Sequence, residues 1–179
     1  MIQNTTTQWG WPAKLLHWIA AAESVVLLVH GWWMTNITSR PERLANYVWH
    51  SALGFDVLAL MLLRLLWRWS HAVPAHSADS KPWERLAPQA GHSGLYVLIF
   101  VVSLTGWAVA NTFRVPIAKD LFGLNVPIIV GAVERATRGL LEGTHMVLAY
   151  VLGALVVAHE AGAFRQHFWK RNDVLRRMI

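Results

Sequence analysis

The stretch Gly143–Phe164, GTHMVLAYVLGALVVAHEAGAF, decides the fold because it is long and apolar yet holds two histidines. It has close to the ~20 residues that a helix needs to cross a bilayer core. His145 and His159 are fourteen residues apart, so a helix brings them back to within about 40° of one face, roughly 21 Å apart along its axis. Ionisable rings inside such a segment are usually functional. The stretch therefore predicts a membrane-spanning helix with two cofactor ligands on one stripe.

The rest of the chain has the composition of a membrane protein. Hydrophobic residues make up 55% of its 179 residues and charged residues only 15%, against about 25% charged in soluble domains. Apolar stretches of spanning length recur at residues 15–36, 47–69, 92–111 and 143–165. The first holds His17 and Glu23 and no small-residue cleavage motif follows it, which argues against a removed signal peptide. The sequence predicts a single transmembrane domain over residues 1–179: an all-α, integral membrane four-helix bundle.

The distribution of basic residues predicts the topology. Ten of the sixteen lysines and arginines fall on the side of the two termini: Lys14, Arg64, Arg68, Lys81, Arg85, Arg165, Lys170, Arg171, Arg176 and Arg177. The other six are Arg40, Arg43, Arg114, Lys119, Arg135 and Arg138. By the positive-inside rule, both termini are expected in the cytoplasm of a bacterium, with the chain crossing the inner membrane several times. The net charge of +6 then needs no nucleic-acid partner, and membrane lipid is the expected surroundings.

The connections between the spans are expected to lie at the membrane surfaces. Asn36–Asn46 is polar, and Ser70–Pro88 contains three prolines, so both are expected to be loops. The longer connection Asn111–Glu142 ends in Ile128–Leu141, which is expected to form a short helix lying on the membrane.

Four histidines pair by depth once the helices are placed in the bilayer. The chain has no cysteine, which excludes disulfides, thiolate ligands and iron–sulfur clusters. With the N-terminus inside, His17 and His159 lie near the cytoplasmic face, and His50 and His145 near the outer face. Two imidazoles from different helices at each of two depths suit two bis-histidine b haems. Zinc, as in a non-redox metal-ion carrier, is the alternative, although it favours three or four ligands at one level.

The remaining histidines allow several interpretations. His30 follows His17 by thirteen residues, which rotates it by about 220° away from that stripe, so it is interpreted as a polar residue at the outer end. His92 lies level with His17 and His159, where it is a spare ligand, a haem-propionate partner, a quinone contact or a polar helix-end residue. His167 lies at the inner interface, where it is a candidate contact for a quinone head group.

Two arginines near the inner end of the second span are candidate partners of haem propionates. Arg64 and Arg68 carry the positive charge and the forked donors that carboxylates favour. Arg68 equally suits an anchor that reaches the aqueous interface. The spacing of the sequence offers no partner for Glu23.

Taken together, the motifs resemble the bacterial cytochrome b561 family of small four-helix, di-haem membrane proteins. The resemblance covers nearly the whole chain. Its pieces are KLLHW (14–18), WHSALG (49–54), RLLWR (64–68), GHSGLY (91–96), LTGW (104–107), LFGLNVP (121–127), the histidines at 159 and 167, and RNDVLRRM (171–178).

The resemblance implies that two b haems are held by the pairs His17/His159 and His50/His145. It also implies that a quinone meets the inner haem, near His92, Gln166 and His167. Relatives often have two adjacent histidines where this chain has Gln166-His167, and a glutamine can hydrogen-bond a quinone carbonyl but cannot carry a proton.

Well-understood members of the family look like superoxide oxidases. They take an electron from superoxide at the periplasmic face, pass it through two haems and reduce ubiquinone. On that basis the basic residues of the outer loop are candidates to attract the superoxide anion. The alternative is that they are ordinary surface charges. They are Arg114, Lys119, Arg135 and Arg138. The alternative is a b-type electron-transfer subunit that links the quinone pool to a periplasmic or membrane redox partner and has no superoxide chemistry of its own.

Overall fold

A computed structural model describes residues 1–74, 82–113, 120–121, 124–172 and 175–178 of the chain. Four long helices dominate it: α1 (Trp11–Met34), α2 (Arg40–Ser70), α3 (Pro82–Asn111) and α4 (Arg135–Phe164). The other described elements are an antiparallel strand pair, a π-helix and a 3₁₀-helix: β1 (Asp120–Leu121), β2 (Leu124–Asn125), η1 (Arg165–Trp169) and η2 (Arg176–Met178). The predicted all-α four-helix bundle is confirmed, with the short strand pair as its one addition among the described residues.

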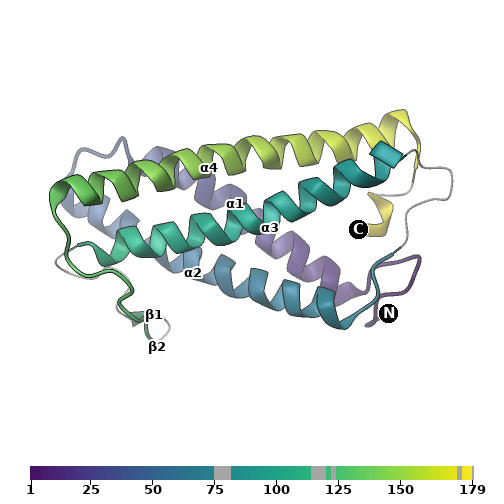
Figure 1. Cartoon of the computed structure of the whole chain (residues 1–179), viewed down its shortest axis with the longest axis horizontal. Coiled ribbons are helices and arrows are strands. Elements are labelled where there is room, and N and C mark those ends of the chain that lie inside the picture. The colour runs from purple at the N-terminus through teal and green to yellow at the C-terminus, as the bar shows by residue number, and fades with distance from the viewer. Residues whose placement is uncertain (75–81, 114–119, 122–123, 173–174, 179) are drawn as a thin grey trace.

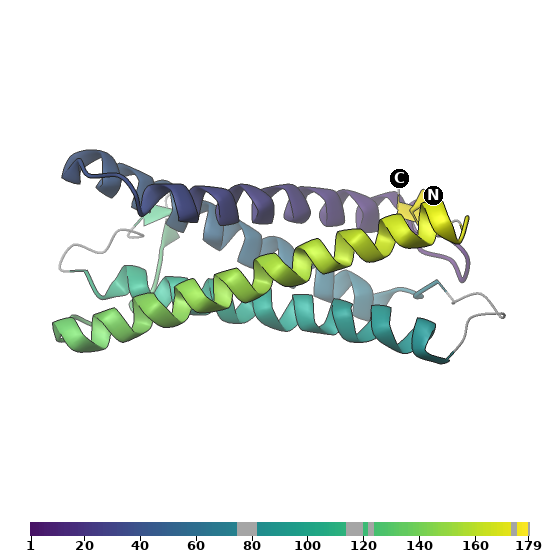
Figure 2. The ribbon, with the colours of Figure 1, turned by 90° about the horizontal axis from the view of Figure 1, so that it is seen from above.

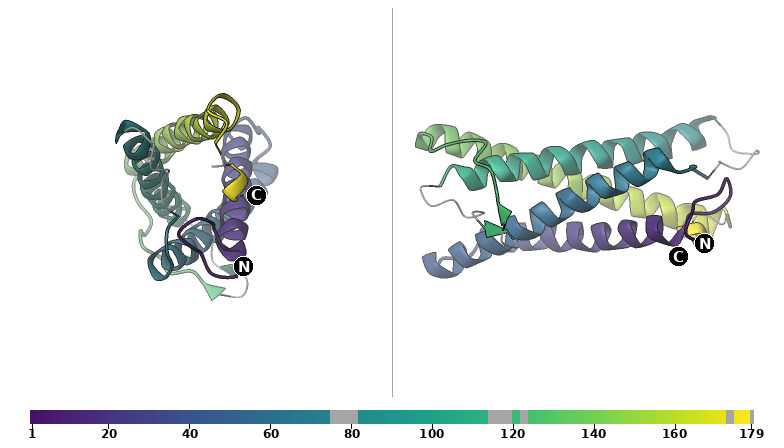
Figure 3. Two further views of the ribbon diagram at one scale, coloured as in Figure 1. Left: turned by 90° about the vertical axis from the view of Figure 1, so that its right-hand side faces the viewer. Right: turned by 90° about the horizontal axis from the view of Figure 1, so that it is seen from below.

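The helices stand in a ring, with α1 beside α2, α2 beside α3, and α3 beside α4 (Figure 3, left). Figure 2 shows α4 crossing the others obliquely. Both termini lie at one end of the bundle, called here the terminal end (Figure 1). β1 and β2 lie toward the opposite end, called here the hairpin end. The position of each histidine along the bundle axis is described below relative to these two ends.

The outer surface of the bundle suits lipid rather than water. All four helices are long and apolar enough to cross a membrane. Large apolar side chains project outward along the helices, among them Val26, Val29, Leu62, Leu63, Val97, Val147 and Val157. Since a contiguous apolar surface of this extent marks an interaction surface, the chain is a multi-pass membrane protein.

Two helices begin earlier than the sequence indicated. α2 begins at Arg40, so much of the predicted loop Asn36–Asn46 is helical. Pro41 in the first turn and Glu42 beside the helix N-terminus both favour this early start. α3 begins at Pro82, inside the predicted loop Ser70–Pro88. Pro88 removes one intrahelical hydrogen bond, but it does so close to the helix end, where water replaces the lost donor.

The expected surface helix over Ile128–Leu141 is wrong. Residues 126–134 have no helix, and α4 then runs without a break from Arg135 into the apolar stretch. No proline follows Pro127, so nothing in the backbone separates the amphipathic start of α4 from its membrane-spanning part.

Residues seven apart divide the interior of the bundle into three layers. The layer nearer the hairpin end holds Gly31, His50, Gly106 and His145, and the layer nearer the terminal end holds His17, Arg64, His92 and His159. Midway lie Ser24, Val57, Ile99 and Leu152, of which all but Ile99 are fully buried. Seven residues of helix span about 10.5 Å. The middle layer therefore lies between two polar layers.

The two terminal segments fold back onto the helices. The Asn4 side chain accepts a hydrogen bond from the backbone N–H of Gly10 at 2.9 Å and donates one to the carbonyl of Ala72, just beyond α2, at 3.0 Å. The Trp18 indole N–H donates to the carbonyl of Met178 at 2.7 Å. Both segments thus close the terminal end of the bundle around α1.

Candidate functional site

The structure brings both predicted histidine pairs together. His17 of α1 faces His159 of α4 with the ring centres 6.4 Å apart and the ring planes at 69°. His50 of α2 faces His145 of α4 with the ring centres 6.2 Å apart and the planes at 89°. We call these the terminal pair and the hairpin pair. Each joins α4 to a different helix, as the depth argument predicted.

Both separations suit one metal ion held between two imidazoles. With metal–nitrogen bonds of about 2 Å and each nitrogen about 1.1 Å from its ring centre, such an ion would separate the ring centres by roughly 6.2 Å. Direct hydrogen bonding between two imidazoles would bring the centres closer, to about 5.1 Å. The pairs are therefore spaced for a bridging atom rather than for each other. Among the described residues, no group of three or more histidine or acidic side chains is placed to hold a metal ion, which disfavours the zinc alternative.

The ring of His145 has a defined tautomer. Its Nδ1 lies 3.1 Å from the carbonyl oxygen of Val102 and 3.2 Å from the Thr105 hydroxyl on α3. A carbonyl only accepts hydrogen bonds, so Nδ1 carries the proton. The lone pair is then on Nε2, the arrangement typical of a metal-ligating histidine.

Two glycines make room for the hairpin pair. A Cβ at Gly31 would lie 3.1 Å from Cε1 of His50, and a Cβ at Gly106 would lie 2.9 Å from Cε1 of His145. The second distance is shorter than real Cβ contacts allow. The glycines at these two positions of the hairpin layer thus let α1 and α3 approach the imidazole rings.

Gly106→Ala is expected to displace the His145 ring and to lower the amount of cofactor that the hairpin pair retains. The added methyl group has no free space at 2.9 Å from Cε1, and overpacking of this kind typically costs about 1–3 kcal/mol. The cofactor-to-protein ratio after purification measures the effect. Gly162→Ala, where a Cβ meets nothing within 4 Å, is the control, and equal ratios in the two variants would contradict the prediction.

A cavity of about 720 Å³ surrounds the hairpin pair. Its lining comes from all four helices and includes His50, His145, Gly31, Gly106 and the buried Ser24. Pockets of a few hundred to 1,000 Å³ with mainly apolar walls and a few polar groups are typical of sites for large organic cofactors. The cavity has room for a flat macrocycle between the helices.

His30 lies close to the hairpin pair, although its angular position on α1 relative to His17 gave no indication of this. Its ring centre is 5.8 Å from that of His50, with the planes at 21°. Its Nε2 is 2.9 Å from Oδ1 of Asn46 on α2. The sequence interpretation as a polar residue near the helix end missed the contact with His50. The helical wheel placed His30 only with respect to His17, whereas the seam between α1 and α2 determines its neighbours.

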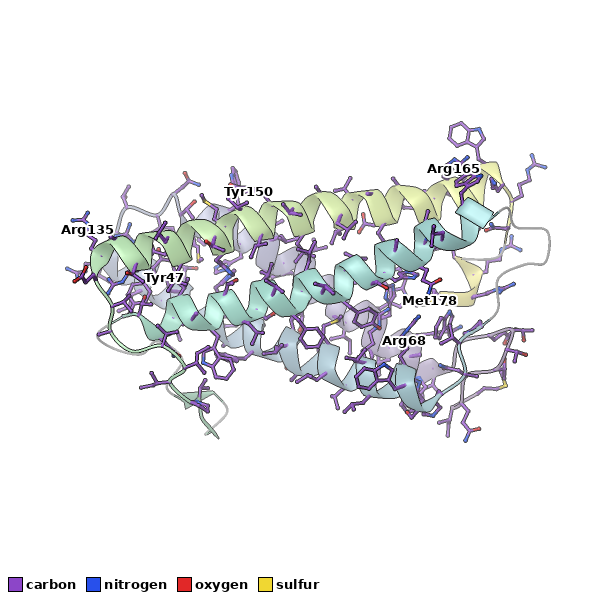
Figure 4. All side chains as sticks on the ribbon, in the orientation of Figure 1. Tyr47, Arg68, Arg135, Tyr150, Arg165 and Met178 are labelled. Atoms are coloured by element: carbon purple, nitrogen blue, oxygen red, sulfur yellow. The ribbon has the colours of Figure 1, made fainter. Side chains whose placement is uncertain are left out.

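His92 occupies the depth predicted for it. Its ring centre lies 5.2 Å from that of His159 with the planes at 61°, so it belongs to the terminal layer beside the terminal pair. Arg64, in the same layer, has its guanidinium 5.5 Å from the centre of the Tyr96 ring. Arg68 lies one turn nearer the terminal end and is half-buried (Figure 4). The terminal layer therefore combines the pair with cationic side chains that suit carboxylates.

The candidate quinone residues lie in the π-helix η1, which continues α4 past Phe164. The Gln166 side chain is already engaged, because its Oε1 accepts a 2.7 Å hydrogen bond from Nδ2 of Asn172. The Nδ1 of His167 is buried and has no hydrogen-bond partner among the described residues. π-Helical turns are frequent at functional sites. The hydrogen bond to Asn172 uses the acceptor of Gln166 and not its Nε2–H₂ donor, so both side chains stay candidates for a quinone contact.

At the hairpin end, two of the four candidate outer cations lie in the described part of the chain. Arg135 is exposed (Figure 4), whereas Arg138 is half-buried and donates a 2.7 Å hydrogen bond to the carbonyl of Thr112. Both line a surface pocket of about 830 Å³, which shares Gly139 and Glu142 with the cavity of the hairpin pair. Arg114 and Lys119 lie outside the described residues. The hairpin pair is thus next to a surface pocket that carries two arginines together with the carboxylates of Glu134 and Glu142.

Comparisons with known proteins agree with the geometry. The family model described as prokaryotic cytochrome b561 matches residues 8–179. Among curated proteins, cytochrome b561 homolog 2 of Escherichia coli (strain K12) is 28% identical over 184 residues, which cover 98% of this chain and 93% of that protein.

Proposed function

The chain belongs to the prokaryotic cytochrome b561 family, and from this premise we propose that it oxidises superoxide at the hairpin end and reduces ubiquinone at the terminal end. Membership of the family supports transmembrane electron transfer by b-type haem as the function of the chain. The finer parts of the proposal are two haems with bis-histidine ligation, the two substrates, and a bacterial inner membrane with the hairpin end toward the periplasm. The spacing of the two histidine pairs, 6.2 and 6.4 Å between ring centres, is the observation that supports it most.

The residues present fit a b haem at each level. His50 and His145 would hold one, within the cavity of about 720 Å³, and His17 and His159 would hold the other. Bound there, b haem supplies one-electron oxidation and reduction at its iron. Gly31 and Gly106 leave space beside the imidazoles of the hairpin pair, and Val102 fixes the His145 tautomer. Arg64 and Arg68 offer charge and donors to propionates near the terminal pair.

The chemistry balances with two molecules of superoxide for each quinone. Each superoxide loses one electron and becomes dioxygen. Ubiquinone gains two electrons and two protons and becomes ubiquinol, with the protons drawn from the aqueous phase at the terminal end. The exposed guanidinium of Arg135 would attract an anion to the pocket beside the hairpin pair, which Arg138, Glu134 and Glu142 also line. His167 offers the quinone a polar atom that has no hydrogen-bond partner among the described residues.

Superoxide is expected to reduce the haems of the wild-type protein at a near-diffusional rate that falls as salt increases, because the encounter is between opposite charges. Arg135→Gln is expected to slow it about tenfold, at the low end of steering effects. Stopped-flow absorbance in the Soret band measures both. Arg165→Gln, which removes an exposed arginine at the terminal end (Figure 4), is the matched control.

A slow reduction that is insensitive to salt and to Arg135 would contradict superoxide as the donor. In that case the second candidate applies, an electron-transfer subunit for a redox protein. It predicts haem reduction by the quinone pool or by a co-purifying dehydrogenase instead.

A further inference from the structure

We infer that His30 orients the haem ligand His50 by accepting a hydrogen bond from its Nδ1, and that Asn46 in turn orients His30. The inference rests on the proposed ligation by His50. It assigns a positioning role to a histidine that lies on a helix with no ligand at that level. Four observations carry it: an unpaired ligand nitrogen, the direction in which that ring faces, the proton on His30, and the separation of the two rings.

The two ligands of the hairpin pair differ in the partner of their second ring nitrogen. A ligating histidine nearly always donates its other N–H to an oxygen or another acceptor, which fixes the ring and strengthens its lone pair. His145 does this toward Val102. The Nδ1 of His50, in contrast, is buried and has no hydrogen-bond partner among the described residues. Because an unpaired buried donor is unfavourable, an acceptor for this N–H is to be expected.

The His50 ring faces the helix that carries His30. The Cε1 corner of the ring points at α1: Cε1, Nδ1 and Nε2 lie 3.1, 3.7 and 4.0 Å from the position of a Cβ at Gly31, so Nδ1 is the nearer of the two nitrogens. His30 is the neighbour of Gly31 in the chain. Its ring centre is 5.8 Å from that of His50.

The proton of His30 is located by Asn46. The Asn46 Nδ2 donates a 2.8 Å hydrogen bond to the carbonyl of Glu42, so the amide oxygen Oδ1 is the atom that faces Nε2 of His30, at 2.9 Å. Because an amide oxygen only accepts, Nε2 of His30 is protonated. In a neutral imidazole, Nδ1 then has the lone pair. That Nδ1 is also buried and has no partner among the described residues.

The separation of the two ring centres is close to that of two imidazoles joined by a hydrogen bond. A direct N–H···N hydrogen bond of about 2.9 Å, with each nitrogen about 1.1 Å from its ring centre, would place the ring centres roughly 5.1 Å apart. The observed 5.8 Å exceeds this by less than 1 Å. The planes are within 21° of parallel, so rotation of the side chains that brings the two rings into one plane would let the in-plane N–H of His50 meet the lone pair of His30.

The chain of hydrogen bonds has a consequence for the redox equilibrium. Acceptance of the His50 Nδ1–H by His30 makes His50 a more basic ligand, which favours the ferric over the ferrous state. Loss of His30 should therefore raise the midpoint potential of the haem at the hairpin pair. The terminal pair lies beyond the middle layer, so a haem held there would be remote from His30.

The test is a spectroelectrochemical titration of the two-haem protein in detergent. His30→Leu is expected to shift the oxidised-to-reduced equilibrium of the hairpin-pair haem about tenfold toward the reduced state, an increase of about 59 mV for a one-electron couple. The potential of the other haem stays constant. Asn46→Leu, which keeps the imidazole but removes its anchor, should raise the same potential by less. His71→Leu, at the far end of α2 where the ring stacks on Trp67, is the control.

Failure of the inference differs from failure of the proposed function. Wild-type protein that lacks two bis-histidine haems contradicts the ligation itself. Protein with two such haems whose potentials are equal in wild type, His30→Leu and Asn46→Leu overturns only the role of His30. If His30→Leu does not retain the hairpin-pair haem, the Asn46→Leu variant tests the inference instead. An increase in the midpoint potential of its hairpin-pair haem supports the role of His30, and an unchanged potential overturns it.

Discussion

On the proposed ligation and function, His145→Ala is expected to halve the haem content of the purified protein, from two haems per chain to one, and to abolish electron transfer from superoxide to ubiquinone. The physical reason is that His145 and His50 would together hold this haem, and loss of one imidazole leaves the site without its second axial nitrogen. The terminal pair lies two layers away, so its haem keeps its own spectrum. A pyridine haemochrome assay and the reduced-minus-oxidised spectrum measure the two effects.

The matched control is His71→Ala, which removes a histidine outside both pairs and should retain both haems. His50→Ala should reproduce the His145→Ala result, since the two residues hold the same cofactor. Two haems with unchanged spectra in His145→Ala would contradict the assignment of the pair.

His17→Ala should separate the two half-reactions of the protein. Superoxide still reduces the remaining haem at the hairpin pair, because the cations beside it are unchanged. Reduction of ubiquinone falls to the level of protein-free vesicles, since the electron has no carrier at the terminal end. Stopped-flow absorbance measures the first reaction, and ubiquinol formation under steady superoxide production measures the second.

Replacement of His167 supplies the comparison. His167→Ala keeps both histidine pairs, so haem reduction by superoxide is normal and only the reaction with quinone slows. If His17→Ala reduced ubiquinone as fast as the wild type, electrons would leave from the hairpin pair, and the proposed direction through the bundle would be wrong.

The sequence was sufficient for the features that depend on periodicity along single helices. The four spans and the depth of each histidine follow from apolar length and from the rise per residue. The pairing of His17 with His159 and of His50 with His145 was predicted from depth, from the shared stripe of α4 and from the family resemblance, with His92 left as a spare ligand at the inner level. The structure places those rings 6.4 and 6.2 Å apart.

Features that depend on how two helices meet were not predictable in this way. The contact of His30 with His50 is set by the seam between α1 and α2, and a helical wheel for α1 contains no information about α2. The start of α2 at Arg40 and of α3 at Pro82 was hidden by prolines, which were interpreted as loop signals although proline is also favoured in a first helical turn. The hydrogen bond between the side chains of Gln166 and Asn172 depends on the path of the chain after η1. Helical periodicity does not predict that path.

Both pairs share α4, and this has a consequence for how the protein is made. α4 is the last of the four helices to leave the ribosome and enter the bilayer. On the proposed ligation, neither haem has its two axial nitrogens until that final insertion, however long the first three helices have been in place. Haem loading is then a late step of biogenesis, and a chain arrested before Arg135 is expected to be a pigment-free set of three helices rather than a half-loaded cytochrome.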